Sequence, residues 1–342
     1  MAGSAMNAWL VEEFGIENLR IDHAPTPQPR PGEIRLDVKA FSLNYRDLMV
    51  VSGQYNPKLK LPAVPVSDAA GVVSAVGEGV RRVRVGDRVM THYVAPWIDG
   101  PFRSEYLAGT LGTPGPGFAA QQVVVSADAV LPIPADYDFA QAATLPIAAL
   151  TAWSALVTEG GLAAGQTLLA LGTGGVSIFA LQFAKAIGAR VFITSGSDAK
   201  LERARLLGAD ETINYRQTPD WDKSVLALTD GRGVDLTVEV GGAGTLERSI
   251  RATRGGGIVA LIGVLSGVRG EFPAVSVLMK RQRVQGILVD SRGAFENMVR
   301  FIERHRIRPV IDRTFAFEQL PQALRAMQAG EHFGKIVVRV AD

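Results

Sequence analysis

The stretch that decides the fold is Leu168-Leu169-Ala170-Leu171-Gly172-Thr173-Gly174-Gly175-Val176-Ser177-Ile178-Phe179-Ala180-Leu181-Gln182-Phe183-Ala184-Lys185. It opens with an apolar run typical of a buried strand, passes through a glycine cluster and continues as a largely apolar helical pattern. Glycines let a backbone approach a pyrophosphate, and a helix N-terminus offers N–H groups and a positive dipole end to it. Strand, tight turn and helix in this order predict a dinucleotide-binding βα unit.

The pattern around this stretch predicts two domains. Short strand-like runs separated by Pro and Gly fill residues from about 6 to 130, and strict strand–helix alternation follows from Gly165 to Ile262. Such alternation predicts an α/β, doubly wound parallel sheet. The terminal run 334–340 is strand-like and is expected to return to the first sheet. We therefore expect one domain at 1–131 and 290–342, and a nucleotide-binding domain at 132–289.

Composition narrows the class of protein. The 342 residues are 47% hydrophobic and 20% charged, with a net charge of only +2 and no cysteine. Mixed charges give no support for a nucleic-acid partner. The apolar runs are broken before transmembrane length, and no signal peptide is evident. We expect a cytoplasmic protein with no membrane partner, and the absence of cysteine excludes disulfides and thiolate metal sites.

The strand after the glycine turn indicates which dinucleotide binds. The motif Gly172-x-Gly174-x-x-Ser177 is weak alone, but its setting in a run of βα units strengthens it. An NAD site usually carries a carboxylate at the end of the next strand. Hydroxyls of Ser195 and Ser197 stand there instead, and Lys200 follows, which favours the 2′-phosphate of NADP. The alternative is that Ser197 only caps a helix and Lys200 is only a solvated helix residue.

Several blocks in fixed order resemble the medium-chain dehydrogenase/reductase superfamily over essentially the whole chain. The resemblance implies a GroES-like β-barrel catalytic domain, completed by C-terminal residues, with a Rossmann domain inserted. The blocks are Ser42-Leu43-Asn44-Tyr45-Arg46-Asp47-Leu48, Ser67-Asp68-Ala69-Ala70-Gly71-Val72-Val73, Val76-Gly77-Glu78-Gly79-Val80, Val85-Gly86-Asp87-Arg88-Val89, the Gly172–Ser177 turn, Leu207-Gly208-Ala209-Asp210 with Ile213-Asn214-Tyr215, and Gly334-Lys335-Ile336-Val337.

The metal ligands of the zinc enzymes in this superfamily are missing. Asn44 stands where the first Cys ligand would be, and Ser67 and Asp68 stand where His and Glu would be. The structural-zinc loop has no counterpart, and the four histidines have no metal spacing. Zinc requires Cys, His or carboxylate ligands in tetrahedral geometry, so we expect no metal. The chain thus resembles the zinc-lacking quinone oxidoreductase branch, with its enoyl and alkenal reductase relatives.

The resemblance also implies site residues. Residues near the nicotinamide cleft on the catalytic side are Asn44, Tyr45, Asp47 and Tyr55. Tyr45 or Tyr55 could donate a hydrogen bond to the substrate oxygen, and Asp47 could hold the loop. Tyr55 could equally be a packing residue, Thr151 an ordinary helix residue and Lys335 a strand-edge lysine. The cofactor set is Thr151, Gly172, Thr173, Gly174, Gly175, Val176, Ser195, Ser197, Lys200, Tyr215, Gly241, Gly263, Val264 and Lys335.

The leading hypothesis is an NADPH-dependent, zinc-independent reductase of a quinone or an α,β-unsaturated carbonyl, with a small molecule as its substrate. One alternative is a zinc-free alcohol or ketone oxidoreductase, for which Asp68 is a base candidate. Another is a non-catalytic NADPH-binding protein. The loops Ala95–Gly117 and Val264–Pro273 are expected to shape the substrate pocket. Val284–Val289 could pair as an edge strand across a two-fold axis, as in family dimers, so we expect a homodimer.

Overall fold

The computed structural model describes residues 5–340, and the chain divides into two compact units. One consists of Met1–Ala148 with Asp290–Asp342, and the other is Ala149–Val289. The expected boundary at 131/132 lies too early in the chain. Strand β7 (Val130–Pro132) pairs with β5 (Arg88–Thr91), and helix α2 (Phe139–Ala142) packs on the strands of the first unit. The tertiary contacts of residues 132–148 therefore place them with the first unit.

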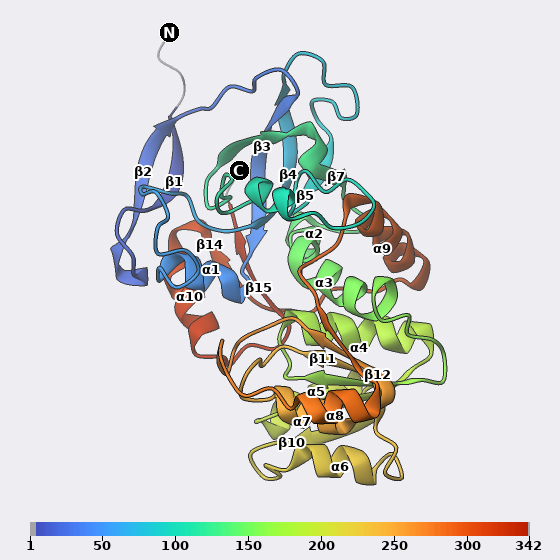
Figure 1. Cartoon of the computed structure of the whole chain (residues 1–342). Coiled ribbons are helices and arrows are strands. Elements are labelled where there is room, and N and C mark those ends of the chain that lie inside the picture. The colour runs from blue at the N-terminus through green and yellow to red at the C-terminus, as the bar shows by residue number, and fades with distance from the viewer. Residues whose placement is uncertain (1–4, 341–342) are drawn as a thin grey trace. The chain divides into compact units, whose positions relative to one another are not determined.

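The second unit is built on a six-stranded, fully parallel sheet in the order β10-β9-β8-β11-β12-β13 (Figure 1). Every side chain of β8 is buried, as expected for a central parallel strand. The order reverses direction between β8 and β11, which is the place where such sheets bind ligands. The strands are β8 (Thr167–Leu171), β9 (Arg190–Ser195), β10 (Glu211–Asn214), β11 (Val234–Glu239), β12 (Thr253–Leu261) and β13 (Arg283–Gly286).

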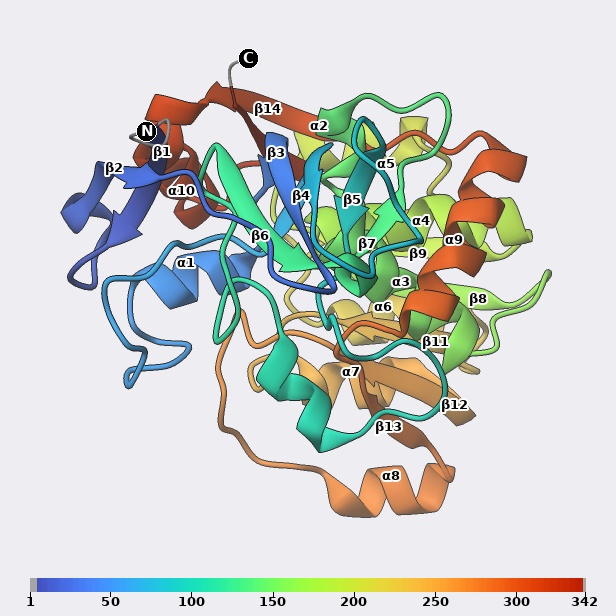
Figure 2. The same ribbon diagram turned by 90° about the horizontal axis from the view of Figure 1, so that it is seen from above.

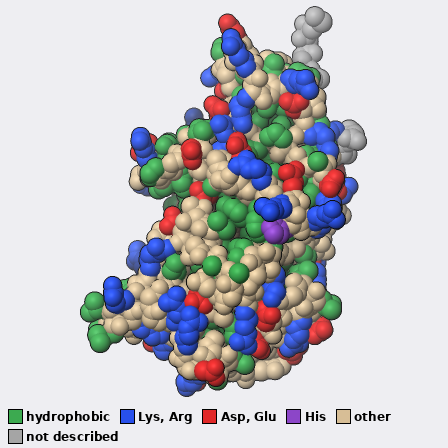
Figure 3. Space-filling view, turned by 90° about the vertical axis from the view of Figure 1, so that its right-hand side faces the viewer, with side chains coloured by type: hydrophobic (Ala, Val, Ile, Leu, Met, Phe, Trp, Pro, Cys, Tyr) green, Lys and Arg blue, Asp and Glu red, His purple; other side chains and the backbone are tan. Residues whose placement is uncertain are grey.

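Helices connect these strands. Helix α4 (Gly175–Ile187), which connects β8 to β9, buries most of its apolar side chains. Helix α8 (Ala274–Lys280) instead exposes Val275, Leu278 and Met279, each more than two-thirds exposed. Hydrophobic side chains project at the lower left of Figure 3, where α8 lies. The helices are α3 (Leu150–Trp153), α4 (Gly175–Ile187), α5 (Asp198–Leu206), α6 (Trp221–Ala227), α7 (Leu246–Ala252) and α8 (Ala274–Lys280).

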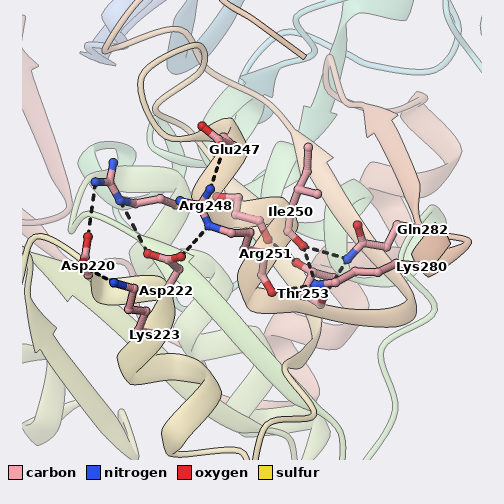
Figure 4. A network of polar contacts seen from close by, with 11 residues as sticks. Asp220, Asp222, Lys223, Glu247, Arg248, Ile250, Arg251, Thr253, Lys280 and Gln282 are labelled. Carbon is pink, nitrogen blue, oxygen red and sulfur yellow. Dashed lines mark hydrogen bonds and ion pairs between the residues drawn. The ribbon is translucent and has the colours of Figure 1, made fainter. Parts of the chain in front are cut away.

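A polar network ties α6, α7 and α8 together (Figure 4). The buried carboxylate of Asp222 accepts a hydrogen bond from Arg251 Nε at 2.8 Å and lies 3.5 Å from Arg248 Nε. Lys280 Nζ donates to three main-chain carbonyls at and just beyond the C-terminal end of α7. These carbonyls have no partner within the helix, so the ammonium satisfies them and also complements the helix dipole.

The first unit is built on a seven-stranded sheet (Figure 2) with the order β14-β15-β3-β4-β5-β7, and β6 pairs with β3. The C-terminal strand β15 pairs antiparallel with β3, so the chain end does return to the first sheet. Among the described residues the strand pairs do not close into a barrel. A separate hairpin forms from β1 (Ala5–Val11) and β2 (Leu19–Pro25). The sheet strands not yet bounded are β3 (Glu33–Ser42), β4 (Asp68–Val76), β6 (Gln122–Ser126), β14 (Ile311–Ala316) and β15 (Lys335–Arg339).

The helices of the first unit include one that the sequence pattern did not reveal, α1 (Tyr45–Val51). The long segment Ala95–Gly117 contains a short 3₁₀ helix, Ser104–Gly109, instead of being loop throughout. Two helices of the C-terminal part, α9 (Arg292–His305) and α10 (Leu320–Gln328), agree with the expected helices to within a few residues.

One helical run, Phe139–Thr158, is long and apolar enough to cross a membrane by length and composition alone. Of its most apolar window, 83% is buried inside the protein, as in the core helix of a soluble protein. Pro146 lacks an N–H donor, and the run widens there into a π-helical turn, Leu145–Ala149. The proline thus alters the run without ending it.

Candidate active site

The glycine turn of the second unit leaves an open space next to its backbone. Gly172 has a φ of +70°, which favours glycine. A Cβ added at Gly172 or at Gly174 would meet nothing within 4 Å. The buried hydroxyl of Ser177 donates to Leu171 O at 2.6 Å and ties the helix to the end of β8. Thr173 is buried in the turn, whereas the expected contacts Gly175 and Val176 form the first turn of α4. The turn therefore offers backbone and space to a phosphate group.

The end of β9 carries hydroxyls in place of a free carboxylate. Ser197 caps α5, and its Oγ accepts a hydrogen bond from Lys200 N at 3.4 Å, while Ser195 is buried. Asp198 is the first residue of α5, and its carboxylate accepts from Asn214 Nδ2 at 2.7 Å and Gln217 Nε2 at 2.8 Å. Its two oxygens are thus already hydrogen-bonded within the unit.

A second cation lies at this strand end, and the sequence reasoning missed it. A Cβ built on Gly196 would lie 2.8 Å from Arg216 Nε and 2.9 Å from the Tyr215 hydroxyl. The chain brings them there because Tyr215 N donates to Ser195 O at 3.1 Å, directly after β10. The sequence feature that could have indicated this cation is the position of Arg216 directly after Tyr215. Arg216 joins Lys200 as a candidate phosphate ligand.

The remaining expected cofactor residues of this unit lie at strand ends or in a helix. Glu239 is fully buried at the end of β11 and accepts from Gly241 N at 2.7 Å, which fixes that loop. A Cβ on Gly263 would lie 2.2 Å from Val240 O, so only glycine fits there, and Val264 is partly exposed beside it. Thr151 is buried in α3, where its hydroxyl donates to Leu288 O at 3.1 Å.

The first unit contains a buried polar cluster where β3 and β15 meet. Val337 pairs with Ser42, and extending this antiparallel register brings Lys335 opposite Asn44. Lys335 Nζ donates to Leu43 O and to Asn44 Oδ1, both at 2.7 Å. Asn44 Nδ2 in turn donates to Asp68 Oδ2 at 2.8 Å. The expected cofactor residue Lys335 is therefore buried and occupied within its own unit, and it is not a strand-edge lysine.

A second chain of contacts joins the same cluster through Asp47. Asp47 Oδ2 accepts from Asn44 N at 2.8 Å and caps α1, while Asp47 Oδ1 accepts from Ser67 Oγ at 2.7 Å. Arg46 Nη1 donates to Ser67 Oγ and lies 3.7 Å from Asp47 Oδ1. These contacts are the ones expected if Asp47 holds the loop.

Burial governs the electrostatics of this cluster. It raises the pKa of Asp68 to about 7, against the effect of Lys335 and the hydrogen bond from Asn44, and it also raises the pKa of Asp47. Burial likewise lowers the pKa of Lys335, although Asp68 opposes that shift. Asp68 Oδ1 is buried and has no hydrogen-bond partner among the described residues. Two carboxyl groups and two cationic side chains therefore share one desolvated space.

The two expected tyrosine donors remain accessible at the edge of this cluster. Tyr45 and Tyr55 are 41% and 42% exposed. The guanidinium of Arg46 lies 4.5 Å from the centre of the Tyr55 ring and 5.0 Å from that of Tyr93. The sequence reasoning named neither Arg46 nor Tyr93 as a site residue, although Arg46 lies in the block that carries Asn44 and Asp47.

Comparisons with known proteins give a consistent picture. Residues 30–135 match the family model of the alcohol dehydrogenase GroES-like domain, and residues 175–304 match that of the zinc-binding dehydrogenases. A "zinc-type alcohol dehydrogenase-like protein" of Schizosaccharomyces pombe is 40% identical over 96% of this chain and 97% of its own.

Two solved structures show how far the similarity extends. One, titled an NAD-dependent alcohol dehydrogenase, is 36% identical over 98% of this chain and 100% of its own, with a TM-score of 0.90. The quinone oxidoreductase of Coxiella burnetii is 26% identical over 99% of this chain and 100% of its own, with a TM-score of 0.81.

Proposed function

This chain belongs to the medium-chain dehydrogenase/reductase superfamily and is an oxidoreductase of that family, and we propose that it reduces a quinone or an α,β-unsaturated carbonyl with NADPH and without zinc. The observation that carries the proposal is the closed polar cluster around Asn44, Asp47, Ser67 and Asp68. The quinone oxidoreductase similarity supports the same class of acceptor.

The cluster does not fit a catalytic zinc ion. Zinc requires several Cys, His or carboxylate ligands in tetrahedral geometry. Asn44 and Ser67 occupy two of the positions that would hold ligands, and among residues 5–340 no three His, Cys, Asp or Glu residues gather as a metal site. The carboxyl groups of Asp47 and Asp68 already face the cations of Arg46 and Lys335. A divalent ion would leave this cluster with excess positive charge.

The zinc in the name of one matching family model does not oppose this proposal. The zinc-binding dehydrogenase model matches residues 175–304, which contain neither Asn44 nor Ser67. The region with those two positions matches the GroES-like model. The name of the first model therefore says nothing about the ligand positions of this chain.

The second unit fits a nicotinamide dinucleotide. The turn at Gly172 and Gly174 and the first turn of α4 would hold the pyrophosphate. Ser197, Lys200 and Arg216 would hold the 2′-phosphate, which is our reason to favour NADP over NAD. When bound, the cofactor supplies the hydride, and the protein contributes orientation and a hydrogen bond to the substrate oxygen.

A second candidate function is a zinc-free alcohol or ketone oxidoreductase. Of the compared proteins, one is named an alcohol dehydrogenase and another is named alcohol dehydrogenase-like. That reaction needs a group that exchanges a proton near neutral pH. Asp68, with its unpartnered Oδ1 and a pKa raised by burial to about 7, favours this alternative.

One assay separates these candidates. We would follow NADPH oxidation with quinones, enones, enals and ketones, and NADP⁺ reduction with alcohols. We expect turnover with quinones or enones that survives a chelator, with far less than one zinc per purified chain. Turnover only with alcohols and ketones would support the alternative, stoichiometric zinc would refute the metal-free site, and silence would favour a non-catalytic NADPH-binding protein.

We further propose that the second unit mediates homodimer formation. Strand β13 is the last strand of the parallel sheet, no described strand pairs with its outer edge, and this edge would pair with a second copy. The neighbouring α8 exposes Leu278 and Met279, which a partner would cover. Light scattering should give twice the monomer mass for the wild type and less for Leu278→Asp. A monomeric wild type would refute the proposal.

A further inference from the structure

The guanidinium of Arg46 lies between two tyrosine rings, at the border between buried and exposed structure. Its carbon is 4.5 Å from the Tyr55 centroid and 5.0 Å from the Tyr93 centroid. The Arg46 side chain is only 11% exposed, and Tyr93 is fully buried, but Tyr55 is 42% exposed. One face of the cation thus contacts the core, and the other contacts a tyrosine that a substrate can reach.

Local backbone geometry brings these groups together. Helix α1 places Arg46 in its first turn, and the chain reverses at Gly53, whose φ is +74°. Tyr55 N then donates to Met49 O at 3.0 Å, so that Tyr55 folds back over the helix. Tyr93 follows β5, and its carbonyl accepts from Leu111 N at 2.9 Å.

The hydrogen bonds of Arg46 are few for a buried guanidinium. It donates to Ser67 Oγ, to Leu111 O at 3.4 Å and to Thr113 O at 3.5 Å, and it also interacts with the Tyr55 side chain, whereas Nε is buried without a partner among the described residues. Two of these distances are long for hydrogen bonds. A Cβ at Gly112, where φ is +79°, would lie 3.0 Å from Arg46 Nη1, so the loop closes tightly over the cation.

The charge of the cation persists despite its burial. Burial lowers the pKa of Arg46, but Tyr93, Asp47 and Tyr55 outweigh it, so that its pKa lies above the ordinary value. A cation over an aromatic ring is attracted to the ring more strongly when it is desolvated. This attraction holds the Tyr55 ring in one position, although Tyr55 lies on an exposed segment after α1.

We propose that Arg46 is a positioning residue that holds Tyr55 as the hydrogen-bond donor to the carbonyl oxygen of the acceptor. The proposal rests on the proposed function. Hydride addition to the acceptor carbon places negative charge on that oxygen. Tyr55 stabilises the charge by donating a hydrogen bond while it keeps its own proton, and the product is protonated from water. The fixed cation beside the ring makes the hydroxyl a stronger donor. Tyr45, the other candidate donor, has no such contact described.

The test is a double-mutant cycle on the NADPH-loaded enzyme with an enone or quinone. We expect Tyr55→Phe to lower kcat about 100-fold, as the loss of one oxyanion donor does, and Arg46→Met to lower it at least about tenfold through misplacement of that donor. The double variant should be no slower than Tyr55→Phe, because both changes remove the same interaction. Arg88→Met is the matched control, since Arg88 lies 4.8 Å from Phe139 in the same unit, away from the cluster; it should leave kcat unchanged.

A spectroscopic readout independent of turnover completes the test. 4-Dimethylaminocinnamaldehyde absorbs at longer wavelength when its carbonyl accepts a hydrogen bond. With NADP⁺, which cannot reduce it, we expect the shift with wild type and Arg88→Met and its loss with Arg46→Met and Tyr55→Phe. Arg46→Lys, which keeps the charge without the planar stack, should retain part of the shift and serves if Arg46→Met does not fold.

The outcomes separate this inference from the proposed function. Two outcomes would overturn the role of Arg46 and leave the proposed function intact. One is wild-type turnover with additive losses in the double variant, and the other is an unchanged spectral shift in Arg46→Met. If the wild type fails to oxidise NADPH with any of the acceptors tested, both the proposed function and this inference are overturned.

Discussion

Replacing Lys335 by Met should destabilise the first unit strongly. Lys335 is 3% exposed, and its ammonium donates to Leu43 O and Asn44 Oδ1, both at 2.7 Å. Its removal leaves two buried acceptors without a donor, at about 1–3 kcal/mol each, and deprives Asp68 and Asp47 of a compensating cation. Breaking a buried ion pair from one side costs about 3–5 kcal/mol. For a domain of this size, each kcal/mol lowers Tm by about 2–4 °C.

The measurement is urea unfolding followed by fluorescence, with Arg339→Met as the matched control. Arg339 lies on the same strand and pairs with Asp138 at 3.1 Å, but its side chain is 61% exposed, so this variant should cost at most about 1 kcal/mol. Adding Asp68→Asn to Lys335→Met should restore part of the lost stability, because it removes an uncompensated charge. If Lys335→Met is as mild as Arg339→Met, the cluster is not held together as described.

Three further predictions concern Asp68 in the first unit and the dinucleotide site of the second. Because burial raises the pKa of Asp68 from 3.8 to about 7, the folded state binds more protons between these values, and the associated stability is lost as pH rises through 7. We therefore expect the Tm of the wild type to fall from about pH 5 to pH 8, and Asp68→Asn should flatten this fall. Lys200→Ala and Arg216→Ala should each raise the Kd for NADPH about tenfold or more in fluorescence titrations, with little change for NADH, and equal changes would disprove the 2′-phosphate assignment. Ser177→Ala removes a buried hydrogen bond and should lower the free energy of unfolding by about 1 kcal/mol, whereas an unchanged denaturation midpoint would contradict this.

The second unit follows from local patterns, whereas the first depends on distant pairing. Alternating strands and helices joined by right-handed crossovers leave few possible strand orders, so the sequence is enough to predict the parallel sheet around β8. The first unit pairs β3 with β4, β6 and β15, and β6 and β15 lie far from it in sequence. No local pattern shows whether such pairs close a barrel. The placement of 132–148 depends equally on contacts with distant strands.

The candidate site shows the same division at the level of single residues. Gly172 and Ser177 act within one turn, and their spacing is visible in the sequence. Lys335 meets Asn44 only because β15 and β3 pair in one register, with Val337 opposite Ser42. A slip by one residue would turn the Lys335 side chain to the other face of the sheet and leave Asn44 and Asp68 without their cation. The buried charge of this site is therefore set by the register of the last strand, which the burial of Ile336 and Val338 on the alternate positions stabilises.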